Sequence, residues 1–163
     1  MERFSRVYFL LFFVVFITAC GTSKTSLTRS PDATPKHEFR GAWVQTVWQD
    51  RYRQMNSAAM KHYLSEMVRK FDEAGINAVI FQVRPEADAF YRSELEPWSR
   101  FLTGTQGVAP DDPDFDPLAF IIEECHKRGM ELHAWLNPYR AKANVTNALA
   151  PGHIYWTYPD RFV

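Results

Sequence analysis

Two segments of the chain concentrate side chains that could bind hydroxyl groups, and each follows a short apolar stretch. Segment 137–140 reads Asn-Pro-Tyr-Arg, which places an amide, a phenol and a guanidinium close together. Such groups hydrogen-bond to the hydroxyls and acetamido groups of a glycan, and aromatic rings stack on the apolar faces of sugars. Segment 84–107 begins with Arg84 and carries four carboxylates and four large aromatics, namely Glu86, Asp88, Glu94, Glu96, Phe90, Tyr91, Trp98 and Phe101.

The overall composition agrees with a carbohydrate ligand and disfavours a nucleic-acid partner. Lys+Arg and Asp+Glu both number 19, so the formal net charge is zero, whereas a nucleic-acid-binding domain usually shows a basic excess. Aromatic residues make up 15% of the 163-residue chain, which mildly favours sugar binding. The length predicts one folded domain.

The histidines and cysteines indicate no metal site and no cofactor. None of the five histidines has the spacing of a metal-ligand set, and His133 is interpreted as an interior histidine. Cys125 lies at helical spacing with Leu118, Ile121 and Ile122, so we expect a buried structural cysteine, not a nucleophile.

The elements that position these segments alternate between strand and helix. Strands are predicted at 39–48, 76–83 and 131–136 from their apolar, β-branched and aromatic content. Asn56 or Ser57 begins a helix of 3.6-residue apolar period that ends near Gly75. A second helix begins at Asp116-Pro117 and ends near Gly129. The order β-α-β-α-β calls for a parallel sheet with right-handed crossovers.

Two architectures fit this order, a (β/α)₈ barrel and an open doubly wound sheet. The chain has no glycine-rich phosphate turn after any predicted strand, which weakens the dinucleotide-binding form of the open sheet. Long polar and aromatic loops follow the second and third strands, and barrels carry their sites on such loops. We therefore predict an α/β fold that is part of a (β/α)₈ TIM barrel of glycosidase type, comprising about its first three strands.

Strand alternation places hydrogen-bonding groups at one rim of the sheet. Residues 131, 133, 135 and 137 share one face of the third strand, which is polar and aromatic, and residues 78, 80, 82 and 84 share a face of the second. We expect the aliphatic faces to pack on the helices and the other faces to point toward the barrel axis.

The first 38 residues precede the folded domain. Arg3 and Arg6 are followed by an apolar run over 7–16 and then by Ile17-Thr18-Ala19-Cys20, a pattern that resembles a bacterial lipoprotein signal. An ordinary signal peptide or an uncleaved anchor is the alternative. We predict a signal over 1–20, lipidation of Cys20, a flexible tether over 21–38, and a barrel domain over 39–163 held on a membrane of the bacterial cell envelope.

Four stretches resemble the glycosyl-hydrolase-like 10 family. They are Phe-Arg-Gly-Ala-Trp-Val at 39–44, segment 81–99 with its Arg-Pro-Glu-Ala-Asp sequence, Leu-Thr-Gly-Thr-Gln-Gly at 102–107, and segment 126–141 with its Leu-Asn-Pro-Tyr-Arg sequence. The resemblance implies a (β/α)₈ glycosidase barrel, often in an envelope lipoprotein, and a carbohydrate substrate such as peptidoglycan glycan. It also implies substrate-binding roles for Arg84, Asp88, Tyr91, Trp98, Asn137, Tyr139 and Arg140.

Some of these residues have plausible structural roles instead. Arg84 could pair with Asp88, and Trp43 and Trp135 are expected in the barrel core. Glycoside hydrolysis needs an acid and a second carboxylate at a set separation, and Glu86 and Asp88 are too near each other to be an obvious pair. The resemblance implies that the reacting carboxylates lie on later strands, beyond Val163.

Three functions remain open from the sequence. In the first, the intact protein hydrolyses envelope glycan and this region supplies part of the substrate cleft. In the second, the protein is a non-catalytic glycan-binding envelope lipoprotein. The third is another barrel chemistry, such as a lyase or a deacetylase. We expect the 163 residues alone to be inactive and marginally stable, because such a barrel closes with eight strands.

Overall fold

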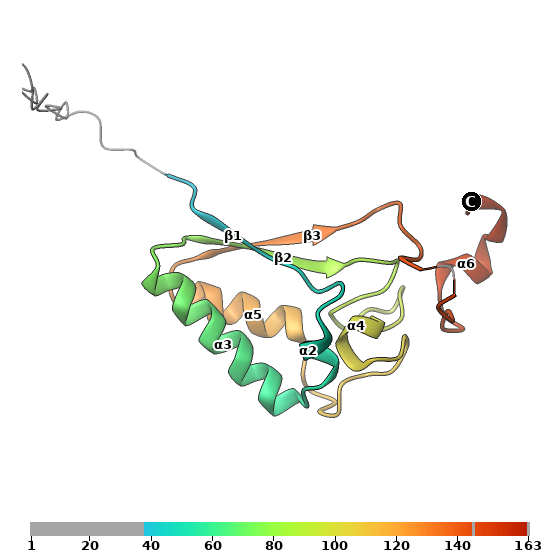
Figure 1. Ribbon diagram of the computed structural model, residues 1–163, viewed down its shortest axis with the longest axis horizontal. Helices are drawn as coiled ribbons and strands as arrows, with labels where there is room; N and C mark the ends of the chain where they lie inside the picture. Colours follow the sequence, from blue (N-terminus) through green and yellow to red (C-terminus); the bar gives the residue numbers. More distant parts are fainter. Residues whose placement is uncertain (1–37, 145, 163) are drawn as a thin grey trace, which may run out of the picture. The chain divides into compact units, whose positions relative to one another are not determined.

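The computed structural model describes residues 38–144 and 146–162. The predicted signal, the lipidation site at Cys20 and nearly all of the predicted tether lie outside the described residues. The described chain is a mixed α/β fold, and Figure 1 shows its sheet covered by helices on one face.

The sheet consists of three parallel strands in the order β1-β2-β3. Their bounds are Gly41–Val44 for β1, Ala78–Arg84 for β2 and Glu131–Leu136 for β3. Trp43 pairs with Ile80, and Ile80 pairs with His133. The predicted β-α-β-α-β order and parallel pairing are therefore confirmed, and the third strand has the predicted bounds.

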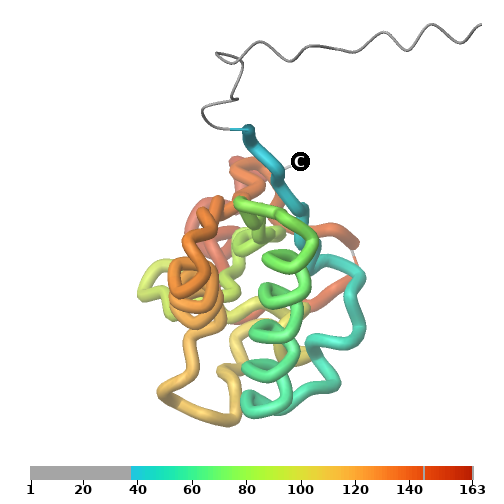
Figure 2. The backbone as a smooth tube through the Cα atoms, turned by 90° about the vertical axis from the view of Figure 1, so that its left-hand side faces the viewer, coloured from blue at the N-terminus to red at the C-terminus, as the bar shows by residue number. Residues whose placement is uncertain are grey.

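Two helices connect the strands and lie side by side against the sheet (Figures 1 and 2). Helix α3 spans Ser57–Glu73, and the side chain of Asn56 accepts a hydrogen bond from the Ala59 amide at 2.8 Å. Helix α5 spans Pro117–His126, and Asp116 accepts from the amides of residues 118 and 119. Both caps are at predicted positions and satisfy amides that have no partner within the helix.

The hydrophobic core lies between the sheet and these two helices. Val79, Phe81 and Val83 of β2 point into it, as expected for alternate residues of a strand. Ile121 and Cys125 of α5 meet them there and are fully buried. Burial of each large apolar side chain contributes about 1.5–3 kcal/mol. The prediction of a buried Cys125 is confirmed, and burial raises the pKa of its thiol to about 11.

Strand β1 is shorter than the predicted 39–48 because a side chain replaces its backbone partners. The Gln82 side-chain oxygen accepts hydrogen bonds from the amides of Thr46 and Val47 at 2.9 and 3.0 Å. These amides therefore turn away from ladder pairing at the end of the strand. Trp48 follows with a φ of 61°, a conformation that a bulky residue in a strand does not adopt.

Short helical turns occupy segments that the sequence predicts as strand end or loop. They are α2 at Asp50–Arg53, α4 at Arg100–Thr103, α6 at Ile154–Thr157 and a 3₁₀ turn, η1, at Pro159–Arg161. Each is one turn long, so periodicity gives no signal for it. Helices α2 and α4 contact each other beyond the ends of the strands.

The face of the sheet away from the helices carries Trp43 and Trp135, whose rings lie 5.6 Å apart. Trp43 is 58% exposed. The register places Gln82 and Trp135 on this same face. The prediction that the aliphatic faces pack on the helices is confirmed for β2, whose Phe81 lies in the core, but in β3 it holds only for Leu132. Ala134 is exposed and Leu136 is 48% exposed.

No helix in the described part of the chain has the length and apolar character needed to cross a bilayer.

Candidate functional site

Arg84 connects the carboxyl ends of two strands to the loop between them. Its Nη1 donates to the backbone oxygen of Asn137 at 2.6 Å, and its Nε donates to Glu96 Oε1 at 2.6 Å. The Asn137 amide returns a hydrogen bond of 2.9 Å to the Arg84 carbonyl. Arg84 therefore forms a structural ion pair, as the alternative interpretation proposed. Its partner is Glu96 and not the expected Asp88.

A shift in register explains why Arg84 and Asn137 do not align as simple alternation predicts. Gln82 pairs with Trp135, but Arg84 pairs with Leu136, so one residue of β2 is extra at this point. Such a bulge redirects side chains. It leaves the Arg84 side chain largely covered, at 17% exposure, beside a Glu96 side chain at 15%.

Asn137 shapes the turn that follows β3. Its side-chain oxygen accepts hydrogen bonds from the amides of Tyr139 and Arg140 at 3.1 and 3.0 Å. An asparagine in this role fixes the local backbone. Its side-chain oxygen is therefore committed to the backbone, and the predicted contact with substrate stays a prediction for its amide nitrogen.

Glu86 and Asp88 lie in the interior beneath the rim. The Glu86 carboxylate receives hydrogen bonds from Arg100 at 3.1 Å and from the Ala143 amide. Asp88 receives them from Gln106 at 3.1 Å and from the amide of Glu86 at 3.3 Å. Both carboxylates are fully buried. Asp88 faces its own loop and not solvent, and its predicted contact with substrate stays a prediction.

Burial is the main influence on the acidity of this pair. It raises the pKa of Glu86, and the nearby Asp88 carboxylate raises it further, against the opposing effect of the hydrogen bond from Ala143. Burial likewise raises the pKa of Asp88, opposed by hydrogen bonds from Gln106 and Ser99. The expectation that these two carboxylates are not an obvious acid–base pair agrees with this arrangement.

Residues around the buried Glu86 and Asp88 form hydrogen bonds that connect the loop after β2 to the loop after β3. His153 Nε2 lies 3.0 Å from the Glu86 carbonyl oxygen, and Gln106 accepts from the Ala150 amide at 2.9 Å. Arg100 donates to the Ala148 carbonyl at 3.0 Å. We call Glu86, Asp88, Arg100, Gln106 and His153 the loop anchor. It holds both rim loops in one arrangement.

Two residues near the rim adopt left-handed backbone conformations that non-glycine residues seldom take. They are Trp48, with φ of 61°, and Ala87, with φ of 52°. Trp48 is 63% exposed and its ring meets the edge of Phe101 at 6.0 Å. Such conformations cost about 1–3 kcal/mol and persist where the surroundings hold them. Both follow the ends of strands, as functional segments of parallel sheets do.

Tyr139 and Arg140, two of the predicted binding residues, line a pocket of about 480 Å³ after β3. Tyr139 is 92% exposed. Tyr155 and Arg161 of the last described segment also line it, so two segments of the chain form the walls of this pocket. Sequence reasoning missed these two residues because no strand or long helix placed them at the rim.

Tyr91 and Trp98, two further predicted binding residues, lie away from the pocket after β3. Both are partly buried and pack against the hydrophobic core, and neither lines the pocket after β3. Burial raises the pKa of the Tyr91 hydroxyl, and the Glu96 carboxylate adds to this effect. A binding role for either ring stays a prediction.

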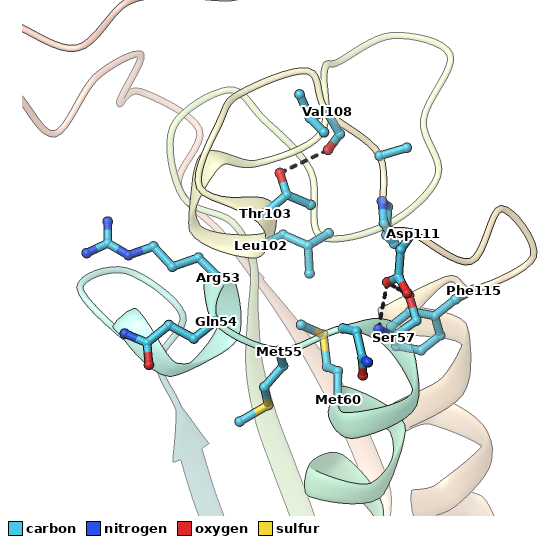
Figure 3. Close-up of a pocket in the computed structure, with 13 residues that line it drawn as sticks. Arg53, Gln54, Met55, Ser57, Met60, Leu102, Thr103, Val108, Asp111 and Phe115 are labelled. Atoms are coloured by element: carbon cyan, nitrogen blue, oxygen red, sulfur yellow. Dashed lines mark hydrogen bonds between the residues drawn. The ribbon is translucent and has the colours of Figure 1, made fainter.

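A second pocket, of about 520 Å³, lies between the start of α3, helix α4 and segment 108–115 (Figure 3). Asp111 Oδ1 accepts hydrogen bonds from the Ser57 amide at 2.7 Å and from its hydroxyl at 2.6 Å. The polar groups at this helix start are therefore already paired within the protein. No group of three metal-ligating side chains comes together within the described residues.

Comparison with known proteins assigns the sequence to a defined family. The family model described as glycosyl hydrolase-like 10 matches residues 38–161. The chain is 41% identical over 145 residues to the glycosyl hydrolase YngK of Bacillus subtilis (strain 168), covering 86% of this chain and 28% of that protein. It is 36% identical over 139 residues to the glycosyl hydrolase DigH of Escherichia coli (strain K12), covering 79% of this chain and 30% of that protein. The chain thus spans less than a third of these curated relatives.

Proposed function

The chain belongs to the glycosyl hydrolase-like 10 family, and we propose that it forms the substrate-binding part of a glycoside hydrolase built on a (β/α)₈ barrel. The family match over residues 38–161 is the observation that carries this proposal. The parallel sheet supports it, because its helices lie on one face and its polar loops follow the carboxyl ends of the strands.

We assign binding and positioning to the described residues, and no proton transfer. Glycoside hydrolysis uses two carboxyl groups about 5–9.5 Å apart, facing one sugar ring from two sides. Glu86 and Asp88 are buried in the loop anchor, and Glu96 is paired with Arg84. The reacting carboxylates are therefore expected on other parts of the protein.

The proposed substrate is an envelope polysaccharide, with peptidoglycan glycan as the first choice. The support comes from the sequence that precedes the described domain, where an apolar run ends in Cys20. Lipidation there would hold the domain at a membrane of the bacterial envelope through an N-terminal anchor, within reach of that polymer.

A non-catalytic glycan-binding lipoprotein is the second candidate. It is favoured by one observation, the pairing or burial of Glu86, Asp88 and Glu96 in the loop after β2. In this case the rim would hold glycan strands without cleaving them. The two functions predict the same binding and differ in turnover.

The test is to incubate the full-length protein with purified peptidoglycan glycan strands and to measure new reducing ends. Hydrolysis, with loss in Arg140→Gln and not in Lys70→Gln, is the expected result. Lys70 lies exposed on α3, on the helical layer. Binding without new reducing ends would support the second candidate, and absence of both binding and cleavage would overturn the proposal.

A further inference from the structure

The pocket after β3 has an uneven charge distribution. It is lined by three cations, Arg140, Lys142 and Arg161, and by three aromatics, Tyr139, Tyr155 and Phe162, and no Asp or Glu is among its lining residues. The chain as a whole has no net charge. The concentration of positive charge is therefore a property of this pocket and not of the protein surface in general.

Two of these cations differ from the other arginines that the structure describes. The guanidinium groups of residues 40, 51, 53, 69, 84, 92, 100 and 128 all donate hydrogen bonds or form ion pairs within the protein. Arg140 and Arg161 form no ion pair with any described carboxylate. The Arg161 guanidinium instead lies over the Tyr158 ring, 4.4 Å from its centroid. Both therefore keep donors available for an anion, which arginine binds with two parallel hydrogen bonds.

Besides the cationic side chains, aromatic rings give the pocket flat apolar surfaces. Tyr155 and Phe162 lie with their ring centroids 5.6 Å apart, and Tyr139 is almost fully exposed at the rim. Aromatic rings offer a broad apolar surface at small cost in side-chain entropy. A ligand that matches both features has a ring with an apolar face and an anionic substituent.

We propose that this pocket is a subsite for a carboxylate-bearing sugar unit. Arg140 and Arg161 bind the carboxylate, and the pyranose ring lies against Tyr139 or Tyr155. This assignment rests on the proposed glycan substrate and narrows it to an acidic glycan.

The two walls of the pocket are held in place before any ligand binds. The Asn137 side chain fixes the amides of Tyr139 and Arg140 on one wall. On the other wall, His153 Nδ1 accepts from the Tyr155 amide at 3.1 Å while its Nε2 lies at the Glu86 carbonyl. The loop anchor thus joins the two walls, and a preorganised site loses less freedom on binding.

The experiment measures binding of paired sugars to the full-length protein by calorimetry. One pair is N-acetylmuramic acid and its methylamide, and the other is a hexuronate oligomer and the carboxyl-reduced oligomer. The members of each pair share a ring and differ in charge, and comparison between pairs separates the two possible sources of the carboxylate. A sulfated oligosaccharide separates carboxylate recognition from attraction to any anion.

We expect an acidic sugar to bind about tenfold more tightly than its neutral partner, with the preference falling as salt is raised. Arg140→Gln and Arg161→Gln should each remove most of this preference, because each weakens binding of the acidic sugar much more than binding of its neutral partner. Lys70→Gln removes the same charge from the surface of α3 and should leave the preference intact.

Equal affinity for acidic and neutral sugars would overturn the inference, as would equally tight binding of the sulfated probe. An equal loss of preference in Lys70→Gln would also overturn it, because it would show only a long-range charge effect. If the protein cleaves neutral glycan without any acidic preference, this inference fails while the proposed function stands. If it neither binds nor cleaves any glycan, both fail.

Discussion

Arg84 and Asn137 exchange hydrogen bonds across the ends of two parallel strands. The guanidinium of Arg84 donates to the Asn137 carbonyl at 2.6 Å, and the Asn137 amide donates to the Arg84 carbonyl at 2.9 Å. Because Asn137 also shapes the turn that carries Tyr139 and Arg140, the position of the pocket depends on a residue one strand away.

Replacement of Arg84 is expected to destabilise this end of the sheet. In Arg84→Gln, Glu96 stays largely buried without its cation, so the free energy of unfolding should fall by about 1–3 kcal/mol. Denaturant unfolding measures it. Arg53→Gln is the matched control, because it removes an exposed ion pair with Asp50 worth less than about 1 kcal/mol. Equal losses in the two variants would contradict the prediction.

The buried carboxyl of Glu86 predicts a definite pH dependence of stability. Its folded-state pKa is raised, so the folded protein retains a proton that the unfolded chain releases. The free energy of unfolding should therefore fall as pH rises from about 4, the ordinary glutamate value, to the raised pKa. Glu86→Gln cannot titrate, and its stability should fall less over the same range.

Glu124 serves as a control for that measurement, because its pKa is shifted in the opposite direction to that of Glu86. A hydrogen bond from Ser65 lowers its pKa, with further help from Lys127 and Arg128. Its contribution is present above the ordinary glutamate pKa and disappears as pH falls through the lowered value. Glu124→Gln should therefore lose stability at neutral pH and little in acid. If both variants change the pH profile in the same direction, the assignment for Glu86 is wrong.

Loss of His153 should loosen the segment after β3 more than the sheet. The His153 side chain is buried and bridges the Glu86 carbonyl and the Tyr155 amide. His153→Ala leaves these backbone groups unpaired, at a cost of about 1–3 kcal/mol. Hydrogen exchange over 146–158 should accelerate while β2 stays protected. His62→Ala, at an exposed position on α3, should change neither region.

The thiol of Cys125 should be inert in the folded protein. It is fully buried, and its pKa of about 11 leaves almost no thiolate at neutral pH. A thiol reagent should label it only at the rate of unfolding, and Cys125→Ser should lower the free energy of unfolding by about 1–3 kcal/mol through burial of a hydroxyl. Rapid labelling under native conditions would contradict this.

Cys20 is expected to carry the lipid anchor. Labelling of cells with a clickable fatty acid should mark the protein. In Cys20→Ala the label should be absent, and the protein should no longer be recovered in the membrane fraction. Cys125→Ala serves as the matched cysteine control. Undiminished labelling of Cys20→Ala would rule out this site.

Local rules were enough to predict the order and type of the main elements. Caps at Asn56 and Asp116, the apolar periods of the helices and the alternation within β2 and β3 depend on residues a few positions apart. Helical spacing also predicted the burial of Cys125, which the structure confirms. The family resemblance was based on the sequence motifs themselves, and the family match confirms it. The one-turn helices were not predicted because a single turn is too short to show an apolar period. The early end of β1 was not predicted because a distant side chain, Gln82, binds the amides that follow the strand.

Only the tertiary structure decided the partners of the charged side chains at the rim. Alternation shows where Arg84 leaves the strand, but the path of the loop decides that Glu96 meets its guanidinium. Asp88 is covered because Ser99 and Gln106 return to it, and hydrogen bonds offset the cost of burying its carboxylate. Arg140 and Arg161 line the same pocket although they lie in different segments of the chain. Sequence spacing does not predict such contacts, because they depend on how distant segments pack together in the folded chain.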